Sequence, residues 1–139
     1  MRKMIGKFGE PTYTVMRIVL GLLYLSHGLQ KVFGAFNGQI VPFASLIGVA
    51  GILEIVCGPL IVAGLFTSAA AFIAAGEMAF AYFIGHAPRG GVPIQNGGEI
   101  AVALCFAFLY IATQGGGRWA VDRVLHGRRG HRPDRLQGE

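Results

Sequence analysis

The chain has 139 residues and a formal net charge of +5, and it is 53% hydrophobic but only 14% charged. An ordinary soluble domain has about 25% charged residues. A soluble four-helix protein would also need a polar stripe on the outside of every helix, yet the run 43–65 is interrupted only by Ser45, Glu54 and Cys57. The composition therefore argues against a soluble globular domain, and the length suits one compact unit.

Four apolar runs follow one another at roughly 12–33, 43–65, 67–86 and 98–113. Each is close to the length of a bilayer crossing, which takes about 20 residues at a rise of about 1.5 Å per residue. No A-x-A-like cleavage site closes the first run, and His27 and Lys31 interrupt its end. We therefore expect the first run to be a membrane span and not a cleaved signal peptide.

Basic residues gather at both ends of the chain. They are Arg2, Lys3 and Lys7 before the first run, and Arg118, Arg123, Arg128, Arg129, Arg132 and Arg135 after the last. By the positive-inside rule both termini face the cytoplasm, which requires an even number of spans. The sequence thus predicts an all-α integral membrane four-helix bundle with antiparallel, up-down spans in residues 1–116. A basic cytoplasmic tail, residues 117–139, would lie on anionic lipid headgroups; no folded nucleic-acid reader is visible, so we expect no nucleic-acid partner.

Each of the last three runs carries one glutamate: Glu54, Glu77 and Glu99. A carboxylate in the middle of a membrane costs roughly 2.5–3.5 kcal/mol, and about ten large apolar residues recover only about 3–6 kcal/mol. Such spans need partners inside a bundle. The first run offers them, because Arg17, Gly21, Tyr24, Gly28 and Lys31 share one helix face at spacings of four, three, four and three.

We expect the corresponding faces of the other runs to point at this interior. They are Gly51, Glu54 and Gly58 in the second run, Ala70, Ala74, Glu77, Ala81 and Gly85 in the third, and Glu99, Ala103, Phe106, Tyr110 and Thr113 in the fourth. His27 lies one position aside from the first face. Small residues let neighbouring helices approach closely in a membrane.

Two interpretations of the buried ionisable residues stay open. They can be architectural pairs that hold the helices in register, or they can form a pocket coupled to protons or electrons. A flat apolar molecule such as a quinone fits the second interpretation, since Tyr24, Tyr82, Phe83 and Phe106 supply rings and His27 or His86 could donate to a carbonyl. A metal site at His27, His86 and Glu99 has no supporting histidine spacing, so we expect no metal.

The chain resembles the DoxX family of small bacterial inner-membrane proteins. The stretches that carry the resemblance are 17–31 (RIVLGLLYLSHGLQK), 51–67 (GILEIVCGPLIVAGLFT), 77–88 (EMAFAYFIGHAP), 96–99 (NGGE) and 117–122 (GRWAVD). The ending has Ala120 and Val121 before Asp122, where the family more often has Ser-Leu-Asp. The resemblance implies a four-helix bundle in the bacterial inner (plasma) membrane, and it adds Asn96 to the candidate site residues.

The resemblance also implies a link to membrane redox chemistry, as a subunit of a thiosulfate:quinone oxidoreductase or a partner of sulfur-transfer and superoxide-detoxifying enzymes. We therefore expect a quinone-linked accessory or subunit of a membrane oxidoreductase complex. Glu54 and Glu77 would relay protons, while His27 and Lys31 would orient a carbonyl or an oxyanion. No flavin, nicotinamide, haem or iron–sulfur motif marks an independent enzyme. The alternatives are a proton-coupled transporter or channel, which would need a homodimer, and a structural membrane anchor for partner proteins.

Overall fold

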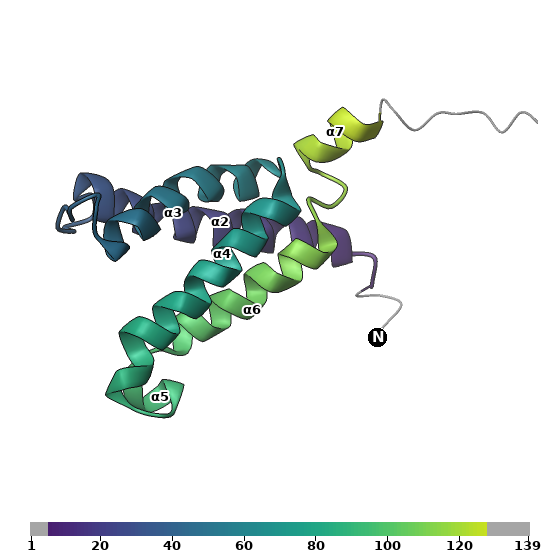
Figure 1. Ribbon diagram of the computed structural model, residues 1–139. Helices are drawn as coiled ribbons and strands as arrows, with labels where there is room; N and C mark the ends of the chain where they lie inside the picture. The colour runs from purple at the N-terminus through teal and green to yellow at the C-terminus, as the bar shows by residue number, and fades with distance from the viewer. Residues whose placement is uncertain (1–5, 128–139) are drawn as a thin grey trace, which may run out of the picture.

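The computed structural model describes residues 6–127, and every regular element in that range is a helix (Figure 1). This confirms the predicted all-α class. A π-helical turn, Tyr82–His86, and a 3-10 turn, Ala87–Arg89, continue the third long helix. The labelled helices are α2 (Gly9–Phe33), α3 (Leu46–Ala63), α4 (Thr67–Ala81), α5 (Pro93–Asn96), α6 (Glu99–Gln114) and α7 (Val121–Gly127).

The ends of α2 and α3 follow local sequence signals. The hydroxyl oxygen of Ser45 accepts a hydrogen bond from the backbone N–H of Gly48, which caps the start of α3. Both helices end on a glycine in the left-handed conformation, Gly34 with φ 68° and Gly64 with φ 73°. Glycine has no Cβ to oppose this conformation, so it is the common residue at such a terminus.

Helices α2 and α3 form an antiparallel pair that is held together at glycines. A Cβ added to Gly28 would lie 2.8 Å from Cβ of Glu54 and 2.9 Å from the carbonyl oxygen of Gly51. A Cβ added to Gly58 would lie 2.9 Å from Cβ and 3.1 Å from Cα of Leu25. The absent side chains let the two backbones approach directly, as expected for membrane helices that associate through small residues.

Helices α4 and α6 form a second antiparallel pair, in which large side chains of one helix pack on alanines of the other. The buried residues of α4 are Thr67, Ala70, Ala71, Ala74, Ala75 and Met78, and those of α6 are Ala101, Leu104, Phe108 and Ile111. This corrects the predicted inner face of the fourth run, because Glu99, Ala103, Phe106, Tyr110 and Thr113 are all exposed. The physical reason is volume: Leu104, Phe108 and Ile111 fill the space that the small residues of α4 leave open.

The two pairs meet where α3 turns into α4 and diverge from that point (Figure 1). The core lies between them, with the ring of Tyr24 packed edge-on against Phe108 at a centroid distance of 5.0 Å. The start of α2, the α3–α4 turn and α7 share one end of the molecule, and α5 lies at the far end of the α4–α6 pair (Figure 1). At this end the hydroxyl of Tyr13 donates a hydrogen bond to the carbonyl oxygen of Gly115, and the backbone N–H of Arg118 donates one to Oε2 of Glu10.

The outside of the helices is apolar. Large side chains such as Val19, Ile52 and Phe72 are exposed. In the described part of the chain two helical stretches, Leu46–Ala63 and Thr67–Arg89, are long and apolar enough to cross a membrane, and α6 is a shorter apolar helix. An apolar exterior of this kind suits a lipid environment.

The glycine contact between α2 and α3 makes a prediction about stability. Gly58→Ala should lower the free energy of unfolding by about 1–3 kcal/mol, because its Cβ has no room beside the backbone of Leu25. The matched control is Gly76→Ala in α4, where an added Cβ meets no heavy atom within 4 Å; it should be neutral or stabilising by up to about 1 kcal/mol. Reversible unfolding in mild detergent measures both, and equal effects of the two substitutions would contradict the packing described.

Candidate functional site

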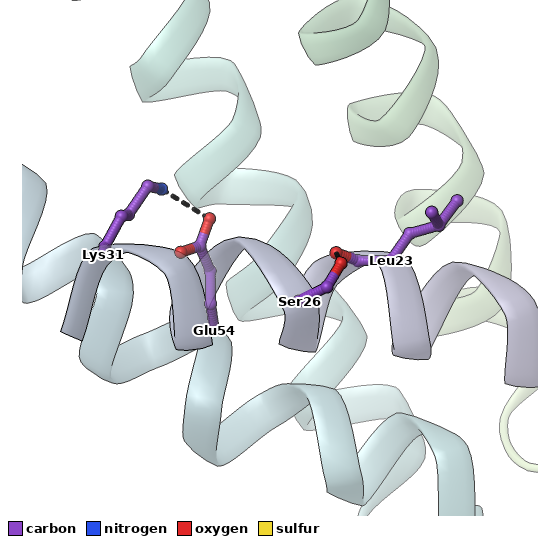
Figure 2. A network of polar contacts seen from close by, with 4 residues as sticks. All are labelled: Leu23, Ser26, Lys31 and Glu54. Atoms are coloured by element: carbon purple, nitrogen blue, oxygen red, sulfur yellow. Dashed lines mark hydrogen bonds and ion pairs between the residues drawn. The ribbon is translucent and has the colours of Figure 1, made fainter. Parts of the chain in front are cut away.

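An ion pair joins α2 to α3 inside the helix pair. The Nζ of Lys31 lies 2.6 Å from Oε1 of Glu54 (Figure 2). Glu54 is 1% exposed and the side chain of Lys31 is 25% exposed. The stem of Lys31 passes over Gly51, where an added Cβ would lie 3.1 Å from Cβ of the lysine. The glycines therefore bring the cation and the carboxylate together, and Glu54 has its charge compensated where solvent cannot reach it.

Away from the face that carries Lys31, α2 has a side-chain hydrogen bond that stays within the helix. The hydroxyl of Ser26 donates to the carbonyl oxygen of Leu23 at 2.7 Å (Figure 2). A serine in a membrane helix can satisfy its hydroxyl in this way on the preceding turn. Ser26 therefore does not contribute to the polar interior.

Tyr24 and Glu77 extend the ion pair to a third helix. Tyr24 is fully buried, and its hydroxyl interacts electrostatically with the carboxylate of Glu77 on α4 and, more weakly, with Glu54. By distance and angle no hydrogen bond is formed at the hydroxyl of Tyr24, at Oε2 of Glu54 or at Oε2 of Glu77, although the Tyr24 hydroxyl is close enough to the Glu77 carboxylate to act as its donor after a small adjustment. We call Tyr24, Lys31, Glu54 and Glu77 the polar cluster. Cys57 on α3 lies beside it, within electrostatic reach of Glu77.

A groove of about 600 Å³ runs between the diverging helices α3 and α4, next to the polar cluster. Its walls are mostly apolar, with Leu53 on the α3 side and Ile73 on the α4 side. Lys31, Glu77 and His86 supply its ionisable side chains. The cluster is therefore continuous with a space large enough for a small molecule, since typical ligand pockets measure about 300–1,000 Å³.

Arg17 is buried, and its hydrogen bonds go to backbone carbonyls, while Asp122 is a carboxylate within electrostatic reach. It is 1% exposed, and its guanidinium donates to the carbonyl oxygens of Ile61 and Val62, and to that of Trp119 at 3.2 Å. The last carbonyls of a helix lack partners within the helix and carry partial negative charge. Arg17 thus ties α2 to the end of α3 and to the segment before α7.

Asp122 caps the start of α4: it accepts hydrogen bonds from free N–H groups there, whereas Arg17 donates to free carbonyl oxygens at the end of α3. Its carboxylate accepts hydrogen bonds from the backbone N–H of Phe66 at 2.8 Å, and from the N–H and the hydroxyl of Thr67 at 3.0 and 3.1 Å. Its own N–H donates to the carbonyl oxygen of Gly64 at 2.9 Å. A carboxylate at a helix N-terminus satisfies free N–H groups and complements the helix dipole. Sequence reasoning missed this residue, and the only signal was the aspartate that ends the stretch GRWAVD.

Asn96 shapes the connection between α4 and α6. It is 5% exposed, its amide nitrogen donates to the carbonyl oxygen of Gly90 at 2.7 Å, and its side-chain oxygen accepts from the N–H of Gly98 at 2.9 Å. The Nδ1 of His86 lies 3.2 Å from the carbonyl oxygen of Asn96. Asn96 therefore acts at a distance from the cluster, by holding the loop that places His86 at the end of the groove.

The remaining two candidates lie outside the cluster. His27 is on the exposed side of α2, and Glu99 is exposed in the first turn of α6, where its charge complements the helix dipole. No group of three histidine, cysteine, aspartate or glutamate side chains in residues 6–127 is placed to hold a metal ion. The structure thus brings together Tyr24, Lys31, Glu54 and Glu77, with His86 at the adjoining groove.

Comparison with known proteins now identifies the family. The model of the DoxX family matches residues 12–87, which is more than half of the chain. The chain belongs to the DoxX family. An uncharacterized protein of Haemophilus influenzae is 41% identical over 115 residues, covering 77% of this chain and 85% of its own. An uncharacterized membrane protein of Mycobacterium tuberculosis is 28% identical over 135 residues, covering 84% and 83%. No solved structure matches the chain.

The comparisons bear on the environment of the apolar exterior. The mycobacterial relative is named as a membrane protein, and the two long apolar stretches of this DoxX chain are compatible with a membrane setting. In a membrane the Lys31–Glu54 pair is removed from water on most sides. Its geometry therefore matters more for stability than that of an ion pair on a soluble surface.

The ion pair of this DoxX protein makes the second prediction. Lys31→Met leaves the carboxylate of Glu54 buried without its cation, and the free energy of unfolding at neutral pH should fall by about 3–5 kcal/mol. The double variant Lys31→Met/Glu54→Leu should lose clearly less than the single one, because no uncompensated charge remains. Glu99→Gln is the control, since its carboxylate is exposed. Additive effects of the two substitutions in a double-mutant cycle would show that the pair contributes nothing.

Proposed function

We propose that this DoxX protein crosses the bacterial inner membrane four times, with both termini in the cytoplasm, and holds a quinone-like molecule in the groove between α3 and α4. In this role it is an accessory or subunit of a membrane oxidoreductase complex. The single observation that carries the proposal is the groove, which combines apolar walls with the ionisable side chains of Lys31, Glu77 and His86. The topology is supported by the basic residues at both ends of the chain.

The chemistry of the groove suits a quinone head group. A quinone presents a flat apolar ring with carbonyl oxygens, and the ammonium group of Lys31 and the imidazole of His86 are donors for such oxygens. Glu77 is the acceptor for a hydroxyl of the reduced form. Pockets for small molecules usually combine apolar walls with a few placed polar groups in this manner.

The position of the groove gives a membrane-soluble ligand a way in. Several of its wall residues are also exposed on the outside of the helices: Ile47 is 57% exposed, Phe80 is 51% exposed and Ile84 is 57% exposed. A ligand can therefore enter sideways from the lipid, with its apolar tail remaining among the acyl chains. In this proposal a redox or sulfur-transfer partner protein supplies the electrons, and the DoxX chain supplies the binding site.

The occupant can be identified by gentle purification and mass spectrometry of the extracted small molecules. The wild type should carry a quinone, and Ile73→Trp, which fills the groove from the α4 wall, should reduce its amount by about tenfold or more. Phe72→Trp is the matched control, because Phe72 is the neighbouring residue of α4 but is 66% exposed and outside the groove. Preparations that repeatedly contain no quinone, or retain it equally in both variants, would refute the proposal.

The topology can be tested by labelling cysteines in intact cells with a reagent that does not cross membranes. In a background with Cys57 and Cys105 replaced by alanine, Gly91→Cys should be labelled from outside, because Gly91 lies in the connection between α4 and α6 with open space around it. Arg123→Cys in α7 should be labelled only after the cells are opened. The reverse pattern, or labelling of both from one side in intact cells, would contradict a four-span chain with cytoplasmic ends.

A further inference from the structure

The polar cluster has fewer hydrogen-bond donors than its oxygens need. Lys31 donates to Glu54, and the other donor is the hydroxyl of Tyr24, which lies beside the carboxylate of Glu77. Three buried oxygens form no hydrogen bond by distance and angle: the hydroxyl of Tyr24, Oε2 of Glu54 and Oε2 of Glu77. Tyr24 and Glu54 are 0% and 1% exposed, so water from outside does not reach them. The tyrosine has one O–H to donate and the ionised carboxylates have none. One proton on a carboxyl group would supply a further donor and give these oxygens partners among themselves.

The positive and negative charges of the polar cluster also do not balance. With both carboxylates ionised and Lys31 protonated, the cluster has a net charge of −1, from two negative groups and one positive group. The groups around Glu77 are Tyr24 and Lys31 on α2 and Glu54 and Cys57 on α3. His86, in the π-helical turn that follows α4, shares the groove with it, while α6 contributes the ring of Phe108 against Tyr24.

Among the described residues, Lys31 is the one cation with an electrostatic interaction with Glu77. A buried charge without a counter-charge is unstable in a medium of low polarity. We propose that the polar cluster is a binding site for one exchangeable proton, held between the carboxyl groups of Glu54 and Glu77 beside the hydroxyl of Tyr24. The proton makes the cluster neutral and completes its hydrogen bonds. Glu54 faces the interior, whereas Glu77 and Lys31 also line the groove. The site is therefore closed on one side and open to the groove on the other.

The use of this proton rests on the proposed function. When a ligand oxygen in the groove becomes basic, as in a quinone that has received electrons from the partner, the O–H bond of the Glu77 carboxyl breaks and a new O–H bond forms on the ligand. Glu77 is left as a carboxylate beside Lys31. The site thus gives the groove a local proton donor that does not depend on water entering from the membrane surface.

Infrared difference spectroscopy of the protein in bilayers tests the proton directly, because a protonated carboxyl has a carbonyl stretch distinct from that of a carboxylate. The wild type should show one such band near neutral pH, and the band should disappear on alkaline titration. Glu77→Gln or Glu54→Gln should remove it, because either substitution leaves one carboxylate paired with Lys31. Glu99→Gln should leave it unchanged, and Tyr24→Phe, which keeps the ring against Phe108, should shift its frequency.

A second variant tests the charge argument. In Lys31→Met the cluster becomes neutral only with both carboxyls protonated, so the band should about double in area. The inference is overturned if both carboxylates are ionised in the folded wild type at neutral pH, if the band survives Glu77→Gln and Glu54→Gln, or if adding Na⁺ at constant pH removes it. These measurements use the protein without ligand. A failure to find a quinone would therefore refute the proposed function without affecting the proposed proton site.

Discussion

The close approach of α2 and α3 at their glycines is the contact on which the rest of the structure depends. Gly28 and Gly58 bring the two backbones to a separation at which even a methyl group would collide with the facing helix. At this separation the stem of Lys31 passes over Gly51 and its ammonium group reaches Glu54. Helices held farther apart by larger residues would leave the carboxylate without a counter-ion in an apolar medium.

The second constraint acts at the end of the molecule where α3 turns into α4. Arg17 binds the last carbonyls of α3, and Asp122 binds the first N–H groups of α4, so both sides of a three-residue turn are fixed by side chains from elsewhere in the chain. With one end fixed, the two helices diverge toward the other end (Figure 1). The groove is the space that this divergence leaves, and Glu77 connects it to the buried pair.

Much of this arrangement could be predicted from the sequence, and the exceptions have physical causes. The inner face of α2 was predictable because polar and small residues recur there at helical spacing between apolar ones. The inner face of α6 was not, because a helix that is apolar all round gives no angular signal, and the packing is decided by which large side chains fit the alanines of α4. Asp122 was missed because it caps a helix 55 residues earlier in the chain. Asn96 and His86 owe their positions to an irregular loop, which spacing rules do not describe.

The most direct test of the account is the distance between Lys31 and Glu54 in a lipid bilayer. Solid-state NMR on protein with ¹⁵N-labelled lysine and ¹³C-labelled glutamate measures the dipolar coupling between the lysine nitrogen and the glutamate carboxyl carbon, with Glu54→Gln to assign the signal. The account predicts a strong coupling, consistent with Nζ and Oε1 in direct contact at 2.6 Å. If none of the signals of Lys3, Lys7 and Lys31 is coupled to a glutamate carboxyl that Glu54→Gln removes, the two helices do not meet as described, and the polar cluster and its groove have no basis.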